Sequence, residues 1–317
     1  MTTQANPHSS NQRLRGALSI IFGAGVWGLF WIPLRHLSEY GLEGLWAVAV
    51  TLVVPLVLAA PFLMRRLVVN FDRNFIILGL IIGCSVVLYF GGVLFSDVVR
   101  VIFLFYMLPI WTTLLGRLIN RELIGPRKLC AIALALLGLY LLLGGGDGGG
   151  GGHGDGGFGA LPIPTNIGDW FGLASGFLWA SSLVFLRRNS TFNPIMATAA
   201  PFVFGAPIAI IAAILMLYFA PDIAPTLPPA TDLLPGLAFA GLFGLVVLAP
   251  AIYGQVWGAR LMPSSTAALL TMVELITATV SAFLLIGTSL DSTALFGGLL
   301  IAAAAVIDLT APTDSTI

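Results

Sequence analysis

Residues 75–95 read FIILGLIIGCSVVLYFGGVLF, a run of 21 residues without a charged side chain. A helix of about 20 mostly apolar residues is long enough to cross the hydrocarbon core of a bilayer. A barrel strand would be shorter and would alternate apolar and polar residues, which this run does not do. The run therefore predicts a transmembrane helix.

Nine similar runs accompany this one along the chain of 317 residues. The ten predicted spans are residues 16–35, 44–64, 75–95, 97–117, 127–144, 169–187, 194–219, 233–254, 263–286 and 292–310. Arg13 and Arg15 precede a first span of full length with no clear cleavage site after it, so we expect this span to be retained. The predicted fold class is an all-α integral membrane protein with ten transmembrane helices.

The composition excludes most classes of soluble protein. Hydrophobic residues make up 58% of the chain and charged residues 9%, with 14 Lys+Arg against 14 Asp+Glu. So few charges cannot cover the surface of a soluble domain of this size. A nucleic-acid-binding protein would carry a basic excess, and a disordered chain would be poor in apolar residues. The expected partner is therefore the lipid bilayer, and no nucleic acid is expected.

The distribution of Lys and Arg predicts the orientation, because positively charged loops remain in the cytoplasm. With the N-terminus inside, only Arg35 and Arg100 fall toward the outer side. The cytoplasmic side then holds Arg13, Arg15, Arg65, Arg66, Arg73, Arg117, Arg121, Arg127, Lys128, Arg187, Arg188 and Arg260. Both termini are therefore predicted to be cytoplasmic, and the protein is expected in the cytoplasmic (inner) membrane of a bacterium.

A glycine-rich segment, GGGDGGGGGHGDGG at residues 144–157, leaves five predicted spans on each side. Such a composition predicts a flexible linker. Its Asp147, His153 and Asp155 lack the GGxGxD order of calcium-binding repeats, so no metal site is expected. The predicted organisation is a tail at 1–15, a five-helix repeat at 16–144, an outer linker at 145–167, a second five-helix repeat at 168–310 and a tail at 311–317.

The two halves share residues at matching positions, which favours an internal duplication. An offset of 152 pairs Trp27 with Trp179, Arg35 with Arg187, and Pro55 with Pro207, and an offset of 166 pairs Gly92 with Gly258. Because five spans are an odd number, the second half must enter the membrane from the opposite face. The result is an inverted repeat, the usual plan of a secondary transporter. Pro55 and Pro207 are candidate hinges for rocking between open faces, or ordinary packing residues.

Short motifs add a resemblance to a known family. They are Gly25-Val26-Trp27-Gly28 in the first span, Tyr106-Met107-Leu108-Pro109 in the fourth, Arg121-Glu122 before the fifth, Trp179 in the sixth and Glu274-Leu275 in the ninth. With these motifs, residues 16–310 resemble the EamA-type ten-helix transporters of the drug/metabolite transporter superfamily. The chain departs from the family after the ninth span, where Gly287-Thr288 replaces an acidic residue.

The resemblance implies a function. It implies a secondary active transporter that moves a small metabolite by alternating access, with efflux of amino acids or related compounds and protons as the coupling ion. It implies no cofactor and two EamA-type repeats at residues 16–144 and 168–310. An uptake permease for a cationic or vitamin-like metabolite is the alternative, and a lipid-handling membrane protein is a further one.

Glu274 is the sharpest single signal, because it lies near the centre of the ninth predicted span. An ionisable group there costs at least about 2.5 kcal/mol on insertion scales, and such groups usually face a cavity or a partner. One interpretation is a contact for a substrate cation or a proton-coupling carboxyl group. The other is a protonated carboxyl group that hydrogen-bonds between helices as a structural element.

Arg100 is the second candidate and lies near the outer end of the fourth span, three residues after Asp97. It either pairs with Asp97 while reaching toward the headgroups, or binds a substrate carboxylate. The fourth and ninth spans are equivalent in the predicted repeat, so we expect Arg100 and Glu274 to line one cavity. There they would bind a zwitterion such as an amino acid, or pair with each other.

Aromatic residues form the third group of candidates. Trp27 and Trp179 are repeat partners in the middle of spans, and Tyr89 and Tyr106 add hydroxyl groups, so these four are predicted to line the substrate cavity. An aromatic wall would suit an apolar or cationic metabolite. The alternative is an interfacial belt, the commoner use of Trp and Tyr in membranes, and this or packing is the expectation for Trp31 and Trp257.

Rival functions find little support in the sequence. No GxxxxGK[ST] loop is present, so ATP-driven transport by this chain is not expected. His8, His36 and His153 are the only histidines, and none forms an HExxH motif or a Cys/His nucleophile arrangement. We therefore expect a transporter for a small-molecule substrate and not an enzyme.

Overall fold

The computed structural model describes residues 7–144, 163–224, 229–287 and 291–310, and its elements within these ranges are helices. Ten helical stretches of these ranges are long and apolar enough to cross a membrane. This confirms the all-α membrane fold and the ten predicted spans. The observed bounds differ most in the first span, which is helical from Pro7, and in the eighth, which continues to Ala259.

Six of the spans are single helices. They are α3 (Gly44–Val69), α4 (Arg73–Phe95), α7 (Pro126–Gly144), α8 (Ile167–Arg188), α9 (Pro194–Phe219) and α14 (Ser292–Leu309). The other four are divided: α1 (Pro7–Gly28) with α2 (Trp31–Glu39), α5 (Val98–Phe105) with α6 (Leu108–Ile119), α10 (Ala230–Phe243) with the π-helix η1 (Gly244–Leu248) and α11 (Ala249–Ala259), and α12 (Ser264–Thr271) with α13 (Val273–Ile286).

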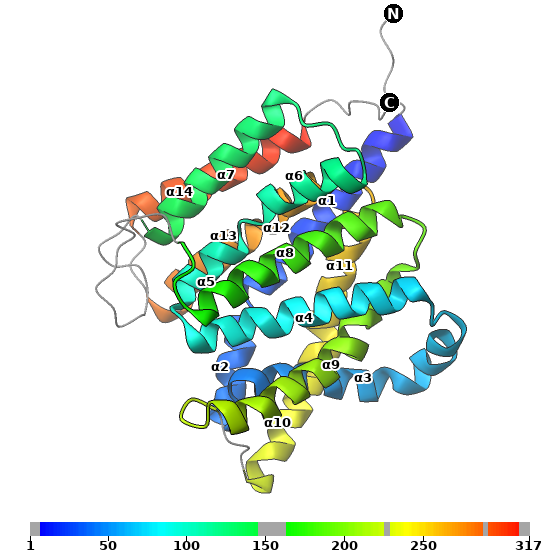
Figure 1. Cartoon of the computed structure of the whole chain (residues 1–317), viewed down its shortest axis with the longest axis vertical. Coiled ribbons are helices and arrows are strands. Elements are labelled where there is room, and N and C mark those ends of the chain that lie inside the picture. Colours follow the sequence, from blue (N-terminus) through cyan, green and yellow to red (C-terminus); the bar gives the residue numbers. More distant parts are fainter. Residues whose placement is uncertain (1–6, 145–162, 225–228, 288–290, 311–317) are drawn as a thin grey trace, which may run out of the picture.

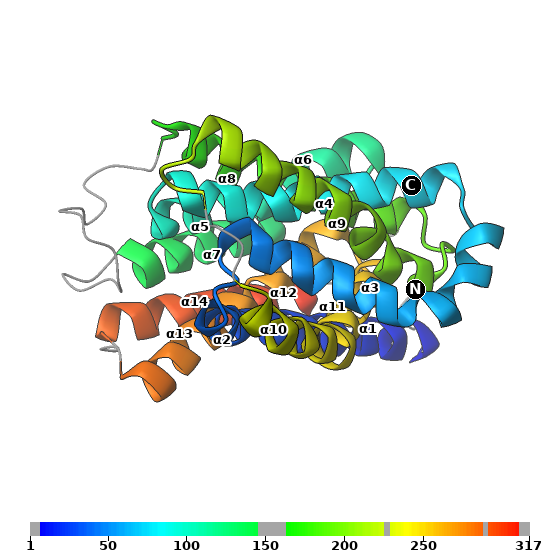
Figure 2. The ribbon, with the colours of Figure 1, turned by 90° about the horizontal axis from the view of Figure 1, so that it is seen from below.

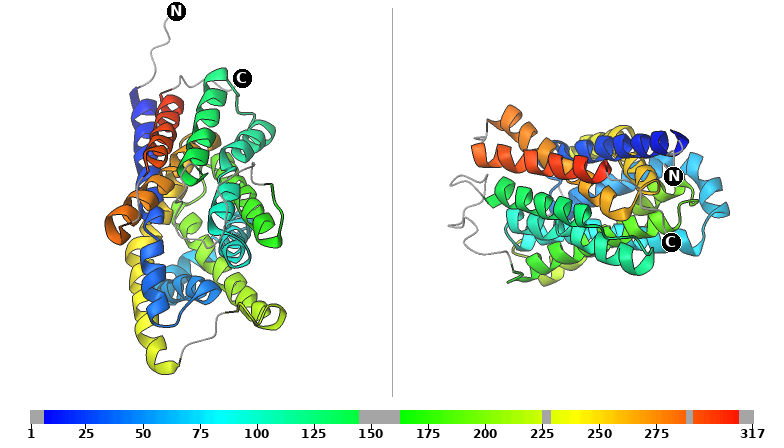
Figure 3. Two further views of the ribbon diagram at one scale, coloured as in Figure 1. Left: turned by 90° about the vertical axis from the view of Figure 1, so that its left-hand side faces the viewer. Right: turned by 90° about the horizontal axis from the view of Figure 1, so that it is seen from above.

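Helices from the two halves of the sequence pack together in one bundle (Figures 1 and 2). α7 lies along α14, α4 lies against α8 and α9, and α1 lies against α11 and α13. α1 begins and α14 ends on the same side of the bundle. A hydrogen bond shows this, since the Arg13 guanidinium donates to the carbonyl oxygen of Asp308 at 3.3 Å. We call this side the terminal side, which lies toward the right in the right-hand view of Figure 3, and the opposite side the linker side.

The fourth and ninth spans are interrupted at matching positions. Each begins with a helix of eight residues, α5 or α12, and then breaks. At the breaks the N–H groups of Met107 and Met272 donate to the carbonyl oxygens three residues earlier, at 3.3 and 3.2 Å, which tightens the helix locally. The parallel agrees with the predicted duplication, and the inverted orientation of the two halves stays a prediction.

The candidate hinge prolines do not divide their helices. α3 continues through Pro55 and α9 through Pro207. The ring of Pro55 packs against Gly244, the first residue of the π-helix in the eighth span. The irregular backbone therefore lies opposite Pro55 and not at it, and the hinge role of both prolines stays a prediction.

A stripe of glycines brings α8 into backbone contact with its neighbours. The stripe consists of Gly168, Gly172 and Gly176, spaced four residues apart on one face. A methyl group on Gly172 would lie 3.0 Å from the Val101 carbonyl oxygen, and one on Gly176 would overlap with that of Phe105. Small residues at such spacing allow membrane helices to approach closely, and here they hold α8 directly against α5.

Candidate functional site

A cavity of about 500 Å³ extends from the middle of the bundle to the linker side. Its deep end is lined by Gln255 of α11 and Glu274 of α13, and its mouth by Glu43, which precedes α3, and Val98, which begins α5. The interruptions of the first, fourth and ninth spans all bring residues to its wall. The irregular backbone and the cavity therefore coincide, as is usual for polar sites inside membrane helices.

Six aromatic rings form a continuous chain along the cavity wall. Successive ring centroids lie 4.9 Å apart for Trp27–Phe30, 6.0 Å for Phe30–Phe90, 5.3 Å for Phe90–Tyr89, 5.1 Å for Tyr89–Phe105 and 5.0 Å for Phe105–Tyr106. Trp31 and Trp179 line the same cavity. All four aromatic residues predicted for the cavity, Trp27, Tyr89, Tyr106 and Trp179, are thus found on its wall.

Glu274 also lies where it was predicted, on the cavity wall near the middle of the ninth span. It is the second residue of α13, directly after the break at Met272. The positive end of a helix dipole favours a negative charge at such a position. The hydroxyl group of Tyr106 lies near the Glu274 carboxyl group and is buried without a hydrogen-bond partner among the described residues. The two interrupted spans meet where α6 packs against α12.

Several polar atoms of the cavity wall have no hydrogen-bond partner among the described residues. They include both side-chain polar atoms of Gln255, Nε2 and Oε1, and the indole nitrogens of Trp27 and Trp179. Gln255 is only 3% exposed. Buried polar atoms are nearly always paired in folded proteins, so these groups are available for a bound molecule.

Formal charge on the cavity wall has one sign. Its described lining residues include the carboxylates of Glu43 and Glu274, and none of them is Lys, Arg or His. Glu43 is exposed at the mouth and Glu274 lies at depth. The wall therefore offers counter-charges to a cation at two depths.

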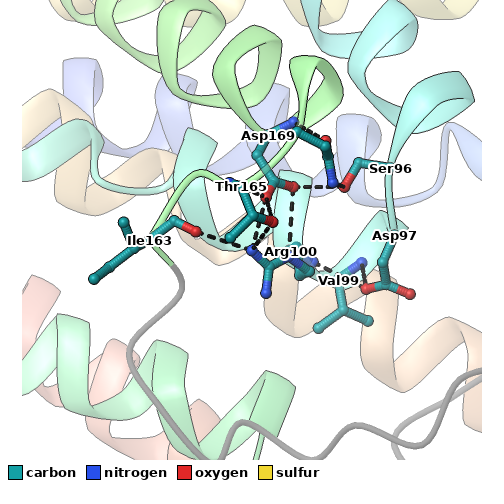
Figure 4. A network of polar contacts seen from close by, with 8 residues as sticks. Ser96, Asp97, Val99, Arg100, Ile163, Thr165 and Asp169 are labelled. Carbon is teal, nitrogen blue, oxygen red and sulfur yellow. Dashed lines mark hydrogen bonds and ion pairs between the residues drawn. The ribbon is translucent and has the colours of Figure 1, made fainter.

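Arg100 is placed elsewhere, and the prediction that it lines the cavity is corrected. Its neighbours Val98 and Ile102 line the cavity, whereas the Arg100 side chain engages Asp169 of α8 (Figure 4). Nη2 lies 2.7 Å from one carboxylate oxygen of Asp169 and donates to the Ile163 carbonyl oxygen at 2.9 Å. This fixed position also separates Arg100 from Glu274, so the two do not form the predicted pair.

The carboxylate of Asp97 does not accept a hydrogen bond from the Arg100 guanidinium. It instead accepts hydrogen bonds from the backbone N–H groups of Val99 and Arg100, at 3.0 and 3.1 Å, and so caps α5. Asp169, whose side chain is fully buried, also accepts from the hydroxyl groups of Ser96 and Thr165. The Arg100–Asp169 cluster therefore ties α5 to α8 on the linker side.

Replacing Arg100 with alanine is expected to lower the melting temperature of the purified protein by several degrees. The change leaves the buried Asp169 carboxylate without its guanidinium, and breaking such a pair costs about 2 kcal/mol or more. Thermal unfolding in detergent measures the effect, with the exposed Arg65→Ala as the control. An unchanged melting temperature together with lost ligand binding would show that Arg100 serves the ligand instead.

One other expectation is corrected by the structure. Trp31, expected in a belt or in packing, lines the cavity and donates from its indole nitrogen to the Ser281 hydroxyl oxygen at 3.0 Å. Glu122 follows the fourth span and forms no ion pair within the described residues. Its carboxylate accepts from the N–H and hydroxyl groups of Ser264, at 3.0 and 2.8 Å, and thereby caps α12.

The terminal side of the bundle is closed by side-chain contacts between spans. Besides Glu122 with Ser264, the Arg187 guanidinium donates to the Arg260 carbonyl oxygen at 3.2 Å, and Arg260 donates to the carbonyl oxygen of Phe192. Burial lowers the pKa of Arg260 from its usual value. These contacts join the loops before α9 and α12 to each other, to the end of α8 and to the segment after α6. They lie between the deep end of the cavity and the terminal side.

No metal centre emerges from the part of the chain that the structure describes. Within it, no three His, Cys, Asp or Glu side chains lie together in a way that could hold a metal ion. Asp147, His153 and Asp155 of the glycine-rich segment lie outside the described residues.

Comparisons with known proteins agree with the fold. The model of the EamA-like transporter family matches residues 14–144 and 166–309. Among solved structures, one described as a crystal structure of a protein is 15% identical, with a TM-score of 0.65 over 96% of this chain and 97% of the other. At that identity the likeness concerns the fold alone. No curated protein matches the sequence.

Proposed function

Because the chain belongs to the EamA-like transporter family, we propose that this membrane transporter moves a small metabolite by alternating access through the described cavity. The family match confirms the resemblance to the ten-helix transporters of the drug/metabolite transporter superfamily. The observation that carries the proposal is the asymmetry of the bundle. The cavity reaches the linker side, whereas side-chain contacts close the terminal side.

This asymmetry is what one state of an alternating-access cycle requires. A site near the middle of the membrane is exposed to one face, and rearrangement of the two halves exposes it to the other. The terminal side carries most of the Lys and Arg residues, which supports a cytoplasmic location for both termini. The structure would then represent an outward-facing state in the cytoplasmic membrane of a bacterium.

Family resemblance supports amino acids or related compounds as the substrate and efflux as the direction. A proton is the proposed coupling ion, because Glu274 at the deep end of the cavity can hold either a proton or the cationic group of a substrate, but not both. An uptake permease for a cationic or vitamin-like metabolite uses the same site with the gradients reversed. A lipid-handling protein is favoured only by the apolar wall.

Flux through reconstituted vesicles tests the proposal. A panel of labelled amino acids and their decarboxylated amines is tested in proteoliposomes, and at least one member is expected to show saturable counterflow that protein-free vesicles lack. Leu94→Trp enlarges a side chain on the cavity wall and is expected to block this flux, whereas Leu80→Trp on the exposed face of the same helix is not. Absence of saturable flux for every water-soluble solute would contradict the proposal and favour lipid handling.

A further inference from the structure

We propose that the cavity selects organic monocations that combine an aromatic body with a neutral hydrogen-bonding group, and that Gln255 determines this specificity. Amino acids with a free carboxylate and organic anions would be excluded. The inference rests on the proposed function, since it concerns the substrate class of the same site. The substrate class is thereby narrowed from amino acids and related compounds to amines that lack a carboxylate.

The charged side chains of the cavity wall disfavour a substrate that carries a carboxylate. A carboxylate that enters the cavity meets Glu43 at the mouth and Glu274 at depth, and no basic side chain among the described lining residues. Arg100 cannot serve it, because its guanidinium is held by Asp169, Thr165 and the Ile163 carbonyl oxygen. A carboxylate buried without a partner loses its hydration without compensation. An amine, by contrast, gains the Glu274 carboxylate.

The chain of aromatic rings on the cavity wall favours an aromatic amine. Cations bind the faces of Trp and Tyr rings, and flat apolar bodies stack against them. Trp27, Tyr89 and Tyr106 belong to the chain of rings on the wall, and Tyr106 approaches Glu274. The carboxylate and the rings thus surround the place of the amine together, which suits an aromatic amine better than a small polar solute.

Gln255 favours a ligand with a neutral hydrogen-bonding group, because it is buried and both its polar side-chain atoms lack a partner among the described residues. Its side chain packs against Gly23 of α1, whereas the backbone of Glu274 packs against Gly28. These glycines are five residues apart, or about 7.5 Å along the helix. The carboxamide and the carboxylate therefore contact separate parts of a ligand, and a neutral group that both donates and accepts would satisfy Gln255.

Four related probes test the inference by calorimetric titration of the purified full-length protein. Tyramine has the amine, the ring and a hydroxyl group; phenethylamine lacks the hydroxyl; tyrosine adds a carboxylate; 4-hydroxyphenylacetate has the carboxylate without the amine. We expect tyramine to bind most tightly, phenethylamine less tightly, tyrosine at least about 10-fold more weakly than tyramine and 4-hydroxyphenylacetate not measurably. Equal or tighter binding of tyrosine or the anion overturns the inference, as does failure of all four to bind.

The Gln255→Leu variant tests the assigned specificity. Leucine has a similar volume but no hydrogen-bonding group, so tyramine is expected to lose its advantage over phenethylamine. Unchanged binding of phenethylamine to the same variant shows that the cavity is intact. If tyramine still binds the variant more tightly than phenethylamine by the same factor, including the case in which both bind equally more weakly, Gln255 does not bind the hydroxyl group. Its role is then structural.

Flux measurements separate the failure of this inference from the failure of the proposed function. Selective binding of the amines without flux of any solute leaves the substrate class standing and contradicts transport. Saturable flux of tyrosine or of 4-hydroxyphenylacetate, with none of tyramine, supports transport and overturns the substrate class.

Discussion

Replacing Glu274 with glutamine is expected to reduce transport by about 30-fold or more and to remove its dependence on pH. The carboxylate is the charged group at the deep end of the cavity, and removing one member of a buried charge pair costs about 2 kcal/mol or more. Glutamine keeps the size and a hydrogen-bonding group for Tyr106 but can neither take up a proton nor neutralise an amine. Initial rates of counterflow in proteoliposomes from pH 5 to pH 9 measure both effects.

Glu43→Gln is the matched control, because it removes the other carboxylate of the wall at the exposed mouth. It is expected to change the rate only a few-fold and to leave the pH dependence in place, since water screens an exposed charge. If Glu274→Gln transports normally across this pH range, the carboxyl group is a structural hydrogen bonder. That result would support the alternative interpretation from the sequence, in which Glu274 is a protonated carboxyl group that hydrogen-bonds between helices.

Replacing Gly28 with alanine is expected to abolish transport and to lower the melting temperature. A methyl group at this position would overlap with the Thr277 hydroxyl oxygen and the carbonyl oxygen of Glu274, so α1 would have to move away from α13. Overpacking of this kind costs about 1–3 kcal/mol. Because Gly28 also lines the cavity, the same movement displaces the wall beside Glu274.

Gly25→Ala tests whether close contact, and not glycine itself, is the reason. A methyl group on Gly25 would lie 3.7 Å from the methyl group of Thr277, an ordinary contact. This variant is expected to retain transport and thermal stability, measured by the same counterflow and unfolding experiments. Equal effects of both substitutions would contradict the packing argument and indicate a need for backbone flexibility along α1.

The fold could be read from the sequence because each span is specified locally. A run of about 20 apolar residues has to form a helix in a membrane whatever its neighbours are. The break in the fourth span has a local signature, because Pro109 is the second residue of α6 and cannot donate a hydrogen bond to the preceding turn. The break at Met272 in the ninth span has no glycine or proline beside it and was not visible in the sequence.

The site was predictable in part. Glu274 and Trp27 were recognisable because an acid and a repeated tryptophan are conspicuous in the middle of a span. Arg100 was misplaced because its partner, Asp169, is 69 residues away along the chain, and its nearest acid, Asp97, caps a helix instead. Gln255 was missed, although a lone amide in an apolar span is itself a signal of a cavity or a partner.

The π-helix Gly244–Leu248 decides which side chain of the eighth span faces the cavity. A π-helical turn contains one residue more than an α-helical turn, so every residue after it is rotated by about 100° relative to an uninterrupted helix. Gln255 lies seven residues beyond this turn and owes its orientation to it. A single-codon deletion at this turn would therefore rotate another residue of α11 into the cavity while all loop lengths stay the same. Ligand preference in such a bundle can change by the addition or loss of one residue, without any substitution in the cavity.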